Sequence, residues 1–359
     1  MNNKKNVCLI FGGRSTEYKV SLRSVCSVLR NIDRELFDVV TVGITEDGAW
    51  YLYRGTPDMI SDDTWTSGDV CPVIIDPACG RGGMRYIDRE TGNATPLDID
   101  VIFPVVHGKY CEDGTLQGLL SMCGIPYVGP NSAASAICMD KTLTKLILSN
   151  YEVPQANALS VDARELANSE DDVLYRIESM FTYPVFVKPS SSGSSVGASK
   201  AVDRDSLISA MKAAAAYDRK ILVEEYIVGR EVEIAALEGE DGTVILSCCG
   251  EINPGDGFYD YETKYENDNA KYYIPARIKP ETELRIKETA SLIFTVLGCR
   301  SLSRIDFFVR DFKGTEQIIF NEINTLPGFT SISMYPQLME KIGISYGELI
   351  TRLIATAGV

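Results

Sequence analysis

The sequence has a single histidine, His107, among 359 residues. Zinc metalloproteases and histidine-rich oxygenases bind their metal through several imidazole groups, so one histidine excludes these classes. Basic residues are also scarce: 35 Lys and Arg against 50 Asp and Glu give a formal net charge of −15. A chain of this charge repels the phosphate backbone, and we therefore expect no nucleic-acid partner.

Other common features are missing as well. No apolar run reaches membrane-spanning length and the N-terminal residues contain no signal-peptide core, so we expect a cytoplasmic protein without a membrane partner. The ten cysteines include no CxxC pair, and most lie in apolar runs, as expected of reduced thiols in the cytosol. The GxGxxG signature of dinucleotide-binding folds is also absent.

What the sequence does contain is the alternation of an α/β protein. The apolar run 6–11 ends in two glycines and is followed by helical periodicity, which is the opening of a βαβ unit. Residues 54–98 give no pattern that can be assigned to elements. The other periodic segments predict strands over 39–44 and 101–106 and helices over 281–297 and 335–357.

Two polar residues follow strands of this first region. Glu17 lies beyond the first strand, where α/β domains collect ligands, but it is equally well explained as an acid favoured at a helix start. His107 comes directly after the strand 101–106, a position typical of site residues, although a lone histidine is more often structural.

Two later segments have the composition of ligand-binding loops. Residues 190–197 are mainly Ser and Gly and follow a strand that ends at Lys188, so their N–H groups can surround a phosphate; a flexible linker is the alternative. Residues 251–278 are too irregular for an ordinary sheet and predict a long ordered loop, which we interpret as a lid. An amphipathic helix carries Lys141.

Near the C-terminus, two apolar runs flank a polar segment that contains Gly314 and predict a β-hairpin. Because side chains alternate along a strand, folding about Gly314 places Asp306 opposite Glu322 and Arg304 opposite Asn324. Facing carboxylates repel each other unless a cation lies between them.

The oxygen ligands of Asp306, Glu322 and Asn324 suit Mg²⁺ and do not suit zinc. The alternative is a half-solvated sheet face on which the acids happen to align. A turn at Pro327-Gly328 follows, and it can bring a backbone N–H close to a reacting oxygen.

Taken in order, these motifs resemble the D-alanine–D-alanine ligase family of the ATP-grasp superfamily. The resemblance runs from end to end and is carried by FGGRSTEYKVSLRS, HGKYCEDGTLQG, CMDK, FVKPSSSGSSVG, EEYIVGREVE, GFYDYETKY, SRIDFF and FNEINTLPGFTSISMYP. It implies a three-domain ATP-grasp fold of α/β and α+β type: an N-terminal Rossmann-like parallel-sheet domain (1–128), a central subdomain (129–227) and a C-terminal subdomain with the metal site and lid (228–359).

The resemblance also implies a nucleotide site. It assigns phosphate binding to Lys141, Lys188, Lys264 and the loop at Ser194 and Ser195, adenine binding to Glu224, Glu225, Tyr226 and Ile227, and ribose binding to Glu231. ATP is the implied cosubstrate. Asp306, Glu322 and Asn324 are the implied ligands of two Mg²⁺ ions, for which Mn²⁺ can substitute.

For the amino acids, the resemblance implies that Glu17 binds the ammonium of the first D-alanine and that Tyr265 is linked to both Glu17 and Ser194. Arg304 and the Gly328 N–H stabilise the oxyanion. The other implied substrate residues are His107, Tyr259, Ser333 and Met334.

The implied reaction joins two D-alanines for peptidoglycan precursors. The first carboxylate attacks the γ-phosphate of ATP, and the amine of the second amino acid then displaces phosphate from the acylphosphate. A homodimer is implied as well.

The sequence departs from the family pattern at Tyr18, Lys19 and Cys111. A Glu-Tyr pair also occurs in relatives that resemble D-alanine–D-serine ligases, which leaves D-serine as an alternative second substrate. Those relatives tend to carry GFFDY and SRYP motifs, whereas this chain has Tyr259 and Met334, and methionine cannot hydrogen-bond a serine hydroxyl. D-Alanine is therefore favoured. A carboxylase-type ATP-grasp enzyme and a non-catalytic Mg-ATP-binding regulator are the competing classes.

Overall fold

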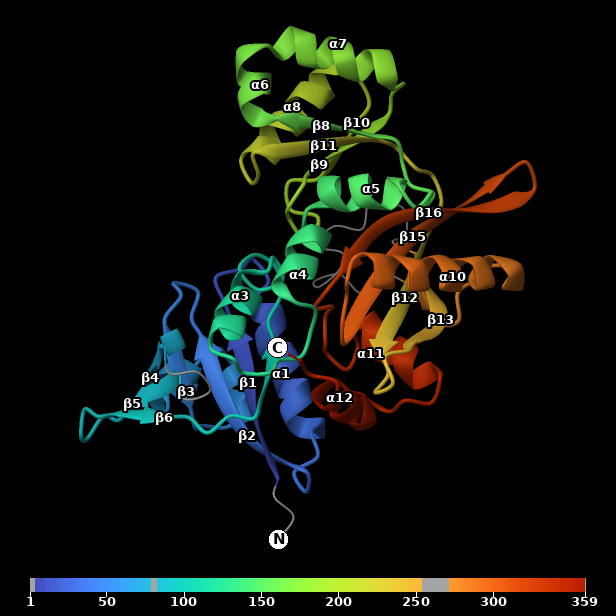
Figure 1. Cartoon of the computed structure of the whole chain (residues 1–359). Coiled ribbons are helices and arrows are strands. Elements are labelled where there is room, and N and C mark those ends of the chain that lie inside the picture. The colour runs from blue at the N-terminus through green and yellow to red at the C-terminus, as the bar shows by residue number, and fades with distance from the viewer. Residues whose placement is uncertain (1–3, 79–82, 254–270, 359) are drawn as a thin grey trace.

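The computed structural model describes residues 4–78, 83–253 and 271–358. In these residues the named strands form three sheets, one within each segment expected to be a domain (Figure 1). The mixed α/β architecture is the expected one. The domain boundaries at 128/129 and 227/228 fall between sheets, and their positions remain a prediction.

The N-terminal sheet has the strand order β6-β5-β4-β3-β2-β1-β7. The expected parallel arrangement holds for β2, β1 and β7, while β3 to β6 extend the sheet with antiparallel strands. Strands β4 to β6 of this extension lie within residues 54–98, the part of the sequence that gave no pattern. The elements are β1 (Lys5–Gly12), α1 (Tyr18–Asn31), β2 (Phe37–Ile44), β3 (Trp50–Tyr53), α2 (Pro57–Ser61), η1 (Trp65–Ser67), β4 (Val70–Ile75), β5 (Met84–Ile87), β6 (Ala94–Pro96), β7 (Val101–Val105) and α3 (Thr115–Met122).

The central sheet is antiparallel in the order β10-β9-β11-β8 and has its own hydrophobic core, formed with α6, α7 and α8. It lies at the top of Figure 1, and α4 and α5 lie between it and the other two sheets. The elements are α4 (Ser132–Met139), α5 (Lys141–Ser149), β8 (Ala158–Asp162), α6 (Ala163–Asn168), α7 (Glu170–Met180), β9 (Val185–Pro189), β10 (Ser199–Ala201), α8 (Arg204–Ala215) and β11 (Lys220–Glu225).

The C-terminal sheet is also antiparallel, in the order β14-β13-β12-β15-β16. The helix expected over 335–357 is in fact two helices, because the chain turns at Gly343, whose φ of +94° is unfavourable for other residues. The elements are β12 (Arg230–Glu238), β13 (Val244–Asn253), β14 (Lys271–Tyr273), α10 (Pro280–Val296), β15 (Leu302–Phe312), β16 (Thr315–Asn324), α11 (Met334–Lys341) and α12 (Tyr346–Ala355).

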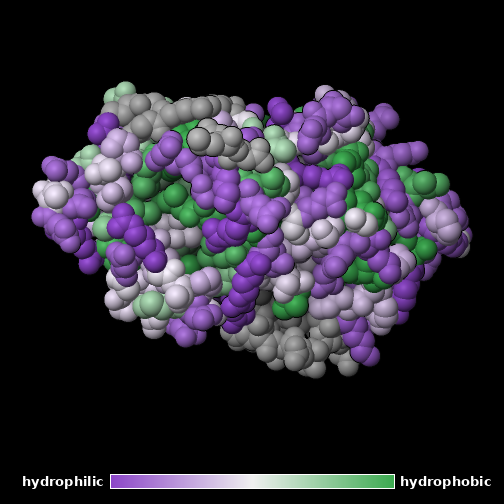
Figure 2. Space-filling model, turned by 90° about the horizontal axis from the view of Figure 1, so that it is seen from below, coloured by the Kyte–Doolittle hydropathy of each residue, from purple (hydrophilic) through white to green (hydrophobic). Residues whose placement is uncertain are grey.

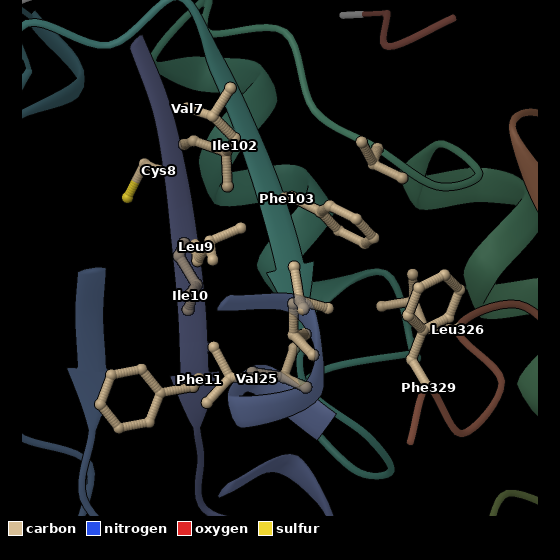
Figure 3. Close-up of a cluster of buried hydrophobic side chains, with 14 of the residues drawn as sticks. Val7, Cys8, Leu9, Ile10, Phe11, Val25, Ile102, Phe103, Leu326 and Phe329 are labelled. Atoms are coloured by element: carbon tan, nitrogen blue, oxygen red, sulfur yellow. The ribbon is translucent and has the colours of Figure 1, made fainter. Parts of the chain in front are cut away.

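The N-terminal and C-terminal parts share one hydrophobic core. Leu326 and Phe329 pack beside β1 and β7 (Figure 3), and the Phe329 ring lies edge-on to Phe103 with 5.6 Å between ring centroids. The last helix, α12, belongs to the same cluster. Burial of this apolar surface holds the two ends of the chain together, whereas the core of the central sheet is separate.

The face of the molecule seen in Figure 2 has an ordinary mixed surface. On the face in Figure 2, hydrophilic residues are interspersed with smaller apolar areas. Among the described residues, no helix combines the length and the apolar character that crossing a membrane requires.

The hairpin β15–β16 has the predicted register at its functional end. Arg304 pairs with Asn324 and Asp306 with Glu322, which confirms the prediction. The turn of the hairpin, however, sets a different register from the expected one. The turn is formed by Lys313 and Gly314, both at positive φ, and it sets Phe312 against Thr315, a register one residue away from the functional one.

A β-bulge at residue 321 corrects this register. Phe307 pairs with Phe320, whereas the next residue back, Asp306, pairs with Glu322, so Asn321 is the extra residue. Without the bulge, Glu322 would oppose Ile305 and face the apolar core. The bulge therefore places both Asn321 and Glu322 on the cavity side of the sheet.

Replacing Gly314 by Ala tests this turn. Gly314 has a φ of +83° and no atom within 4 Å of the position that a Cβ would take, so the substitution adds backbone strain without a clash. We expect Gly314→Ala to lower the free energy of unfolding by about 1 kcal/mol. Lys313→Gly, at a φ of +51°, is the matched control and should change it little. Equal effects in thermal unfolding would contradict this turn geometry.

Candidate active site

A cavity of about 560 Å³ opens between the central and C-terminal sheets. Its volume is in the range of small-molecule sites. The structure brings most of the residues assigned to the nucleotide and the metal to its wall: Lys141, Lys188, Ser195, Glu224, Glu225, Tyr226, Ile227, Glu231, Asp306 and Glu322.

Three carboxylates form a row across the floor of this cavity. Glu233 on β12 pairs with Asp306 on β15, which pairs with Glu322 on β16, so adjacent strands present acids at the same level. Neighbouring like charges destabilise a sheet unless cations lie among them. Positive charge beside the row is therefore needed to offset the repulsion between these carboxylates.

Two basic side chains contact the row. Arg304 donates from Nε and Nη2 to the two oxygens of Asp306, both at 2.8 Å, and its Nε lies 3.0 Å from Glu233. Lys141 Nζ lies 3.3 Å from Glu322 and donates to the Ser192 carbonyl at 2.8 Å. Burial would lower the pKa of Arg304, but Asp306 and Glu233 outweigh it and raise that pKa well above its usual value.

The donor set of this row fits Mg²⁺. Asp306 and Glu322 offer carboxylate oxygens, and Asn324 donates through Nδ2 to Asp306 at 3.0 Å, which leaves its amide oxygen for a cation. In the described part of the chain, no three His, Cys, Asp or Glu side chains converge as a metal cluster. A hard cation here would complete its shell with phosphate oxygens and water, as Mg²⁺ commonly does.

A second charged cluster lies on the central-domain side. Lys188 and Lys145 contact the two oxygens of Glu224 at 2.6 and 2.7 Å. Burial would raise the pKa of Glu224, but the two ammonium groups outweigh it and lower that pKa. Lys145 was not foreseen, although it follows Lys141 by one helical turn on α5 and shares its face, which was the available signal.

The strand end of β11 forms the opposite wall. The Tyr226 ring has the Lys200 ammonium 4.3 Å from its centroid, and Glu225 Oε1 accepts the Asn157 backbone N–H at 3.0 Å. This arrangement offers a flat aromatic and aliphatic surface beside backbone polar groups. It can hold a planar heterocycle.

Glu17 and Ser194 are in direct contact, which the sequence did not predict. Ser194 Oγ donates to Glu17 Oε1 at 2.6 Å, which joins the N-terminal domain to the central loop. A Cβ on Gly108 would lie 2.5 Å from the other Glu17 oxygen, so glycine is needed for this approach. The neighbouring Ser195 faces the large cavity. One loop therefore contributes to both the nucleotide side and the amino-acid side.

His107 connects this region to the turn that carries Gly328. Its Nδ1–H donates to the Leu326 carbonyl at 2.9 Å, and Ser24 Oγ lies 3.2 Å from Nε2. Glu112 Oε1 lies 3.7 Å from Nδ1. Sequence reasoning did not single out Glu112, although it stands in the HGKYCEDG motif.

Other assigned residues lie apart from the cavity wall. Ser333 stands at the N-cap position of α11 and accepts the Thr330 N–H at 3.0 Å, and a Cβ on Gly328 would lie 3.1 Å from its Oγ. Met334 is 7% exposed and lies against Gly250 in the shared core. Its role in selecting the second substrate remains a prediction. Tyr259, Lys264 and Tyr265 lie outside the described residues.

The departures at Tyr18 and Cys111 are also explained in part. Tyr18 is buried, donates to Asp63 at 2.8 Å and accepts from Trp65 Nε1 at 2.9 Å, so its hydroxyl bonds the α2–η1 segment. Cys111 is buried, with its sulfur 3.0 Å from a Cβ position on Gly13. Lys19 is exposed on α1.

Comparison with known proteins identifies the family. Residues 6–130 match the model for the N-terminus of D-Ala–D-Ala ligases, and residues 147–355 match the model for the C-terminus. D-Alanine–D-alanine ligases of Acetivibrio thermocellus and Clostridium novyi are 46% and 44% identical, over 99% of this chain and 96% and 98% of theirs.

Solved structures agree with this. The VanG D-Ala:D-Ser ligase of Enterococcus faecalis superposes with a TM-score of 0.88 at 39% identity, covering 99% of both chains. A D-alanine–D-alanine ligase from Bacillus anthracis complexed with ATP gives 0.70 at 25% identity, covering 98% of this chain and 97% of that one. Three sheets, with a charged cavity between the central and the C-terminal one, are the arrangement of an ATP-grasp enzyme. Within that class, the chain belongs to the D-alanine–D-alanine ligase family.

The pair His107 and Glu112 generates a prediction about pH. Burial raises the pKa of Glu112 to about 7, while burial would lower the pKa of His107 but Glu112 outweighs it and raises that pKa. Both groups hold protons more tightly in the folded state, so their contribution to stability is lost as pH rises from about 5 to 8.

We expect Glu112→Gln to flatten this decline, by on the order of 2 kcal/mol across the window. Thermal unfolding from pH 5 to 8 measures it. Glu35→Gln, at an exposed carboxyl of the same domain, is the control and should follow the parent profile. If Glu112→Gln and the parent lose stability in parallel as pH rises, the pKa of Glu112 is not raised in the folded protein.

Proposed function

We propose that this protein joins two D-alanine molecules in an ATP-dependent reaction through a D-alanyl phosphate, for peptidoglycan precursors. The observation that supports it most is the acidic row with Lys141 and Arg304 at one cavity, connected by a single loop to Glu17. Transfer of a phosphoryl group from ATP needs the acidic row with its basic partners, and recognition of an amino acid needs Glu17.

In the nucleotide part, Lys141 and Lys188 neutralise the phosphates as the γ-phosphoryl is transferred. In the structure both ammonium groups contact carboxylates, at 3.3 and 2.6 Å. When ATP binds, each lysine therefore exchanges a carboxylate partner for a phosphate. Asp306, Glu322 and Asn324 would hold Mg²⁺, which would neutralise negative charge on the phosphates. Two ions, and Mn²⁺ as a substitute, belong to the same proposal.

In the amino-acid part, Glu17 accepts the ammonium of the first D-alanine and leaves its carboxylate free to attack the γ-phosphate. Ser194 fixes the Glu17 carboxylate for this purpose. The amine of the second D-alanine then attacks the acyl carbon, and the tetrahedral oxyanion is stabilised by Arg304 and the Gly328 N–H. His107 holds the Gly328 turn through the Leu326 carbonyl.

D-Serine is the second candidate for the second substrate. The observation that favours it is the likeness to the VanG D-Ala:D-Ser ligase, together with the Glu17-Tyr18 pair. The family models and the curated relatives favour D-alanine. A homodimer and a cytoplasmic location remain part of the proposal, the latter because ATP is the energy source.

Phosphate release tests the proposed reaction. Purified protein with Mg-ATP and D-alanine should release phosphate and form the D-Ala–D-Ala dipeptide. When D-serine is also present, the D-Ala–D-Ser dipeptide should form more slowly than D-Ala–D-Ala. D-Lactate and bicarbonate are the discriminating additions. Release with bicarbonate alone would indicate a carboxylase, and no release above blank with any amino acid would leave a nucleotide-binding regulator.

Glu322→Gln tests the acidic row. The amide keeps the shape but removes the charge that faces Asp306, so we expect turnover to fall by about 10²- to 10³-fold with an unchanged unfolding temperature. Asp311→Asn, an exposed acid on the same hairpin, is the matched control and should retain full turnover. Near-normal turnover of Glu322→Gln would remove this residue from the reaction.

A further inference from the structure

Two cysteines that play no part in the proposed reaction lie in contact. Cys138 is in the last turn of α4 and Cys299 lies in the turn between α10 and β15, and their sulfur atoms are 3.7 Å apart. They are 161 residues apart in sequence and only 3% and 4% exposed. Both belong to the apolar cluster under the C-terminal sheet.

The contact between the two thiols affects their reactivity. Burial raises the pKa of the isolated thiol of Cys8 to about 12. In the pair, either sulfur can donate its proton to the other, and the sulfur that accepts this hydrogen bond is stabilised as a thiolate. One sulfur of the pair can therefore act as the nucleophile while the other holds the proton.

We propose that Cys138 and Cys299 form a reversible disulfide when the protein meets a peroxide. The thiolate of one cysteine attacks one oxygen of hydrogen peroxide, the O–O bond breaks, and a sulfenic acid forms as hydroxide leaves. The sulfur of the other cysteine then attacks the sulfenic sulfur, the S–S bond forms, and the S–O bond breaks. The leaving hydroxide and the earlier one take up the two thiol protons, so two thiols are oxidised and one peroxide is reduced to two waters.

The bond would act on the nucleotide site. A disulfide has a sulfur–sulfur distance of about 2.05 Å, so the 3.7 Å contact must close by more than an ångström in a packed core. Cys138 precedes Lys141 by three residues, and Cys299 precedes Arg304 by five. Closure therefore moves the segment that carries Lys141 against the strand that carries Arg304 and Asp306. The effect of the disulfide on the nucleotide site rests on the proposed function.

The bond itself is tested without any substrate. Full-length protein is treated with hydrogen peroxide, alkylated in denaturant and digested without reductant for mass spectrometry. We expect one linked pair of peptides, containing Cys138 and Cys299, that separates on adding dithiothreitol. It should be absent from Cys138→Ser and Cys299→Ser and retained in Cys26→Ser, a buried thiol on α1. Full alkylation of Cys138 and Cys299, or a different pairing, overturns the proposal.

The effect on the site is tested by turnover and by binding of a fluorescent ATP analogue. A displacement near 1 Å can cost a site up to 10²-fold, so we expect oxidation to lower turnover about tenfold or more, with recovery in dithiothreitol. Cys138→Ser and Cys299→Ala should resist peroxide. A disulfide that leaves turnover and binding unchanged overturns the switch. Absence of ligase activity in the reduced protein would instead refute the proposed function, which the peptide assay distinguishes.

Discussion

Repulsion within a row of three carboxylates is the constraint around which the C-terminal sheet is organised. Glu233, Asp306 and Glu322 stand side by side on adjacent strands, in a cavity where solvent screening is weak. Arg304 reaches across two of them, and Lys141 reaches the third from the start of α5. An arrangement that is costly for folding is retained because it prepares a position for cations and for the triphosphate that accompanies them.

The distribution of hydrophobic cores determines which parts can move during such a reaction. The N-terminal and C-terminal parts are joined by one core through Phe103 and Phe329, whereas the central sheet has a core of its own. Helices α4 and α5 pack against the C-terminal sheet through apolar side chains such as Cys138 and Leu148. Around the cavity, by contrast, the central part reaches the others through polar contacts, among them Ser194 to Glu17 and Lys141 to Glu322. Polar contacts exchange with ligand groups more readily than packed side chains do. We therefore expect the central part to close over a nucleotide by rearranging these polar contacts.

Much of this could be predicted from the sequence, because alternation along strands determines which residues share a face. The pairing of Asp306 with Glu322 was obtained in this way, yet the two-residue turn alone would have set a register one residue off, and the bulge at Asn321 restores it. Nothing in the local sequence signals that bulge. The antiparallel strands over 54–98 were missed because they are short and interrupted, and Glu112 was missed because its proximity to His107 depends on a turn. The break at Gly343 was a signal in the sequence that went unused.

The most direct test is a crystal structure with Mn²⁺ and a non-hydrolysable ATP analogue, in which anomalous scattering locates the metal. The acidic row predicts metal density within ligand distance, about 2.1 Å, of oxygens of both Asp306 and Glu322, with Lys141 moved from Glu322 to a phosphate. Metal bound without either carboxylate, or a nucleotide bound away from the cavity beneath β11, would contradict the central claim.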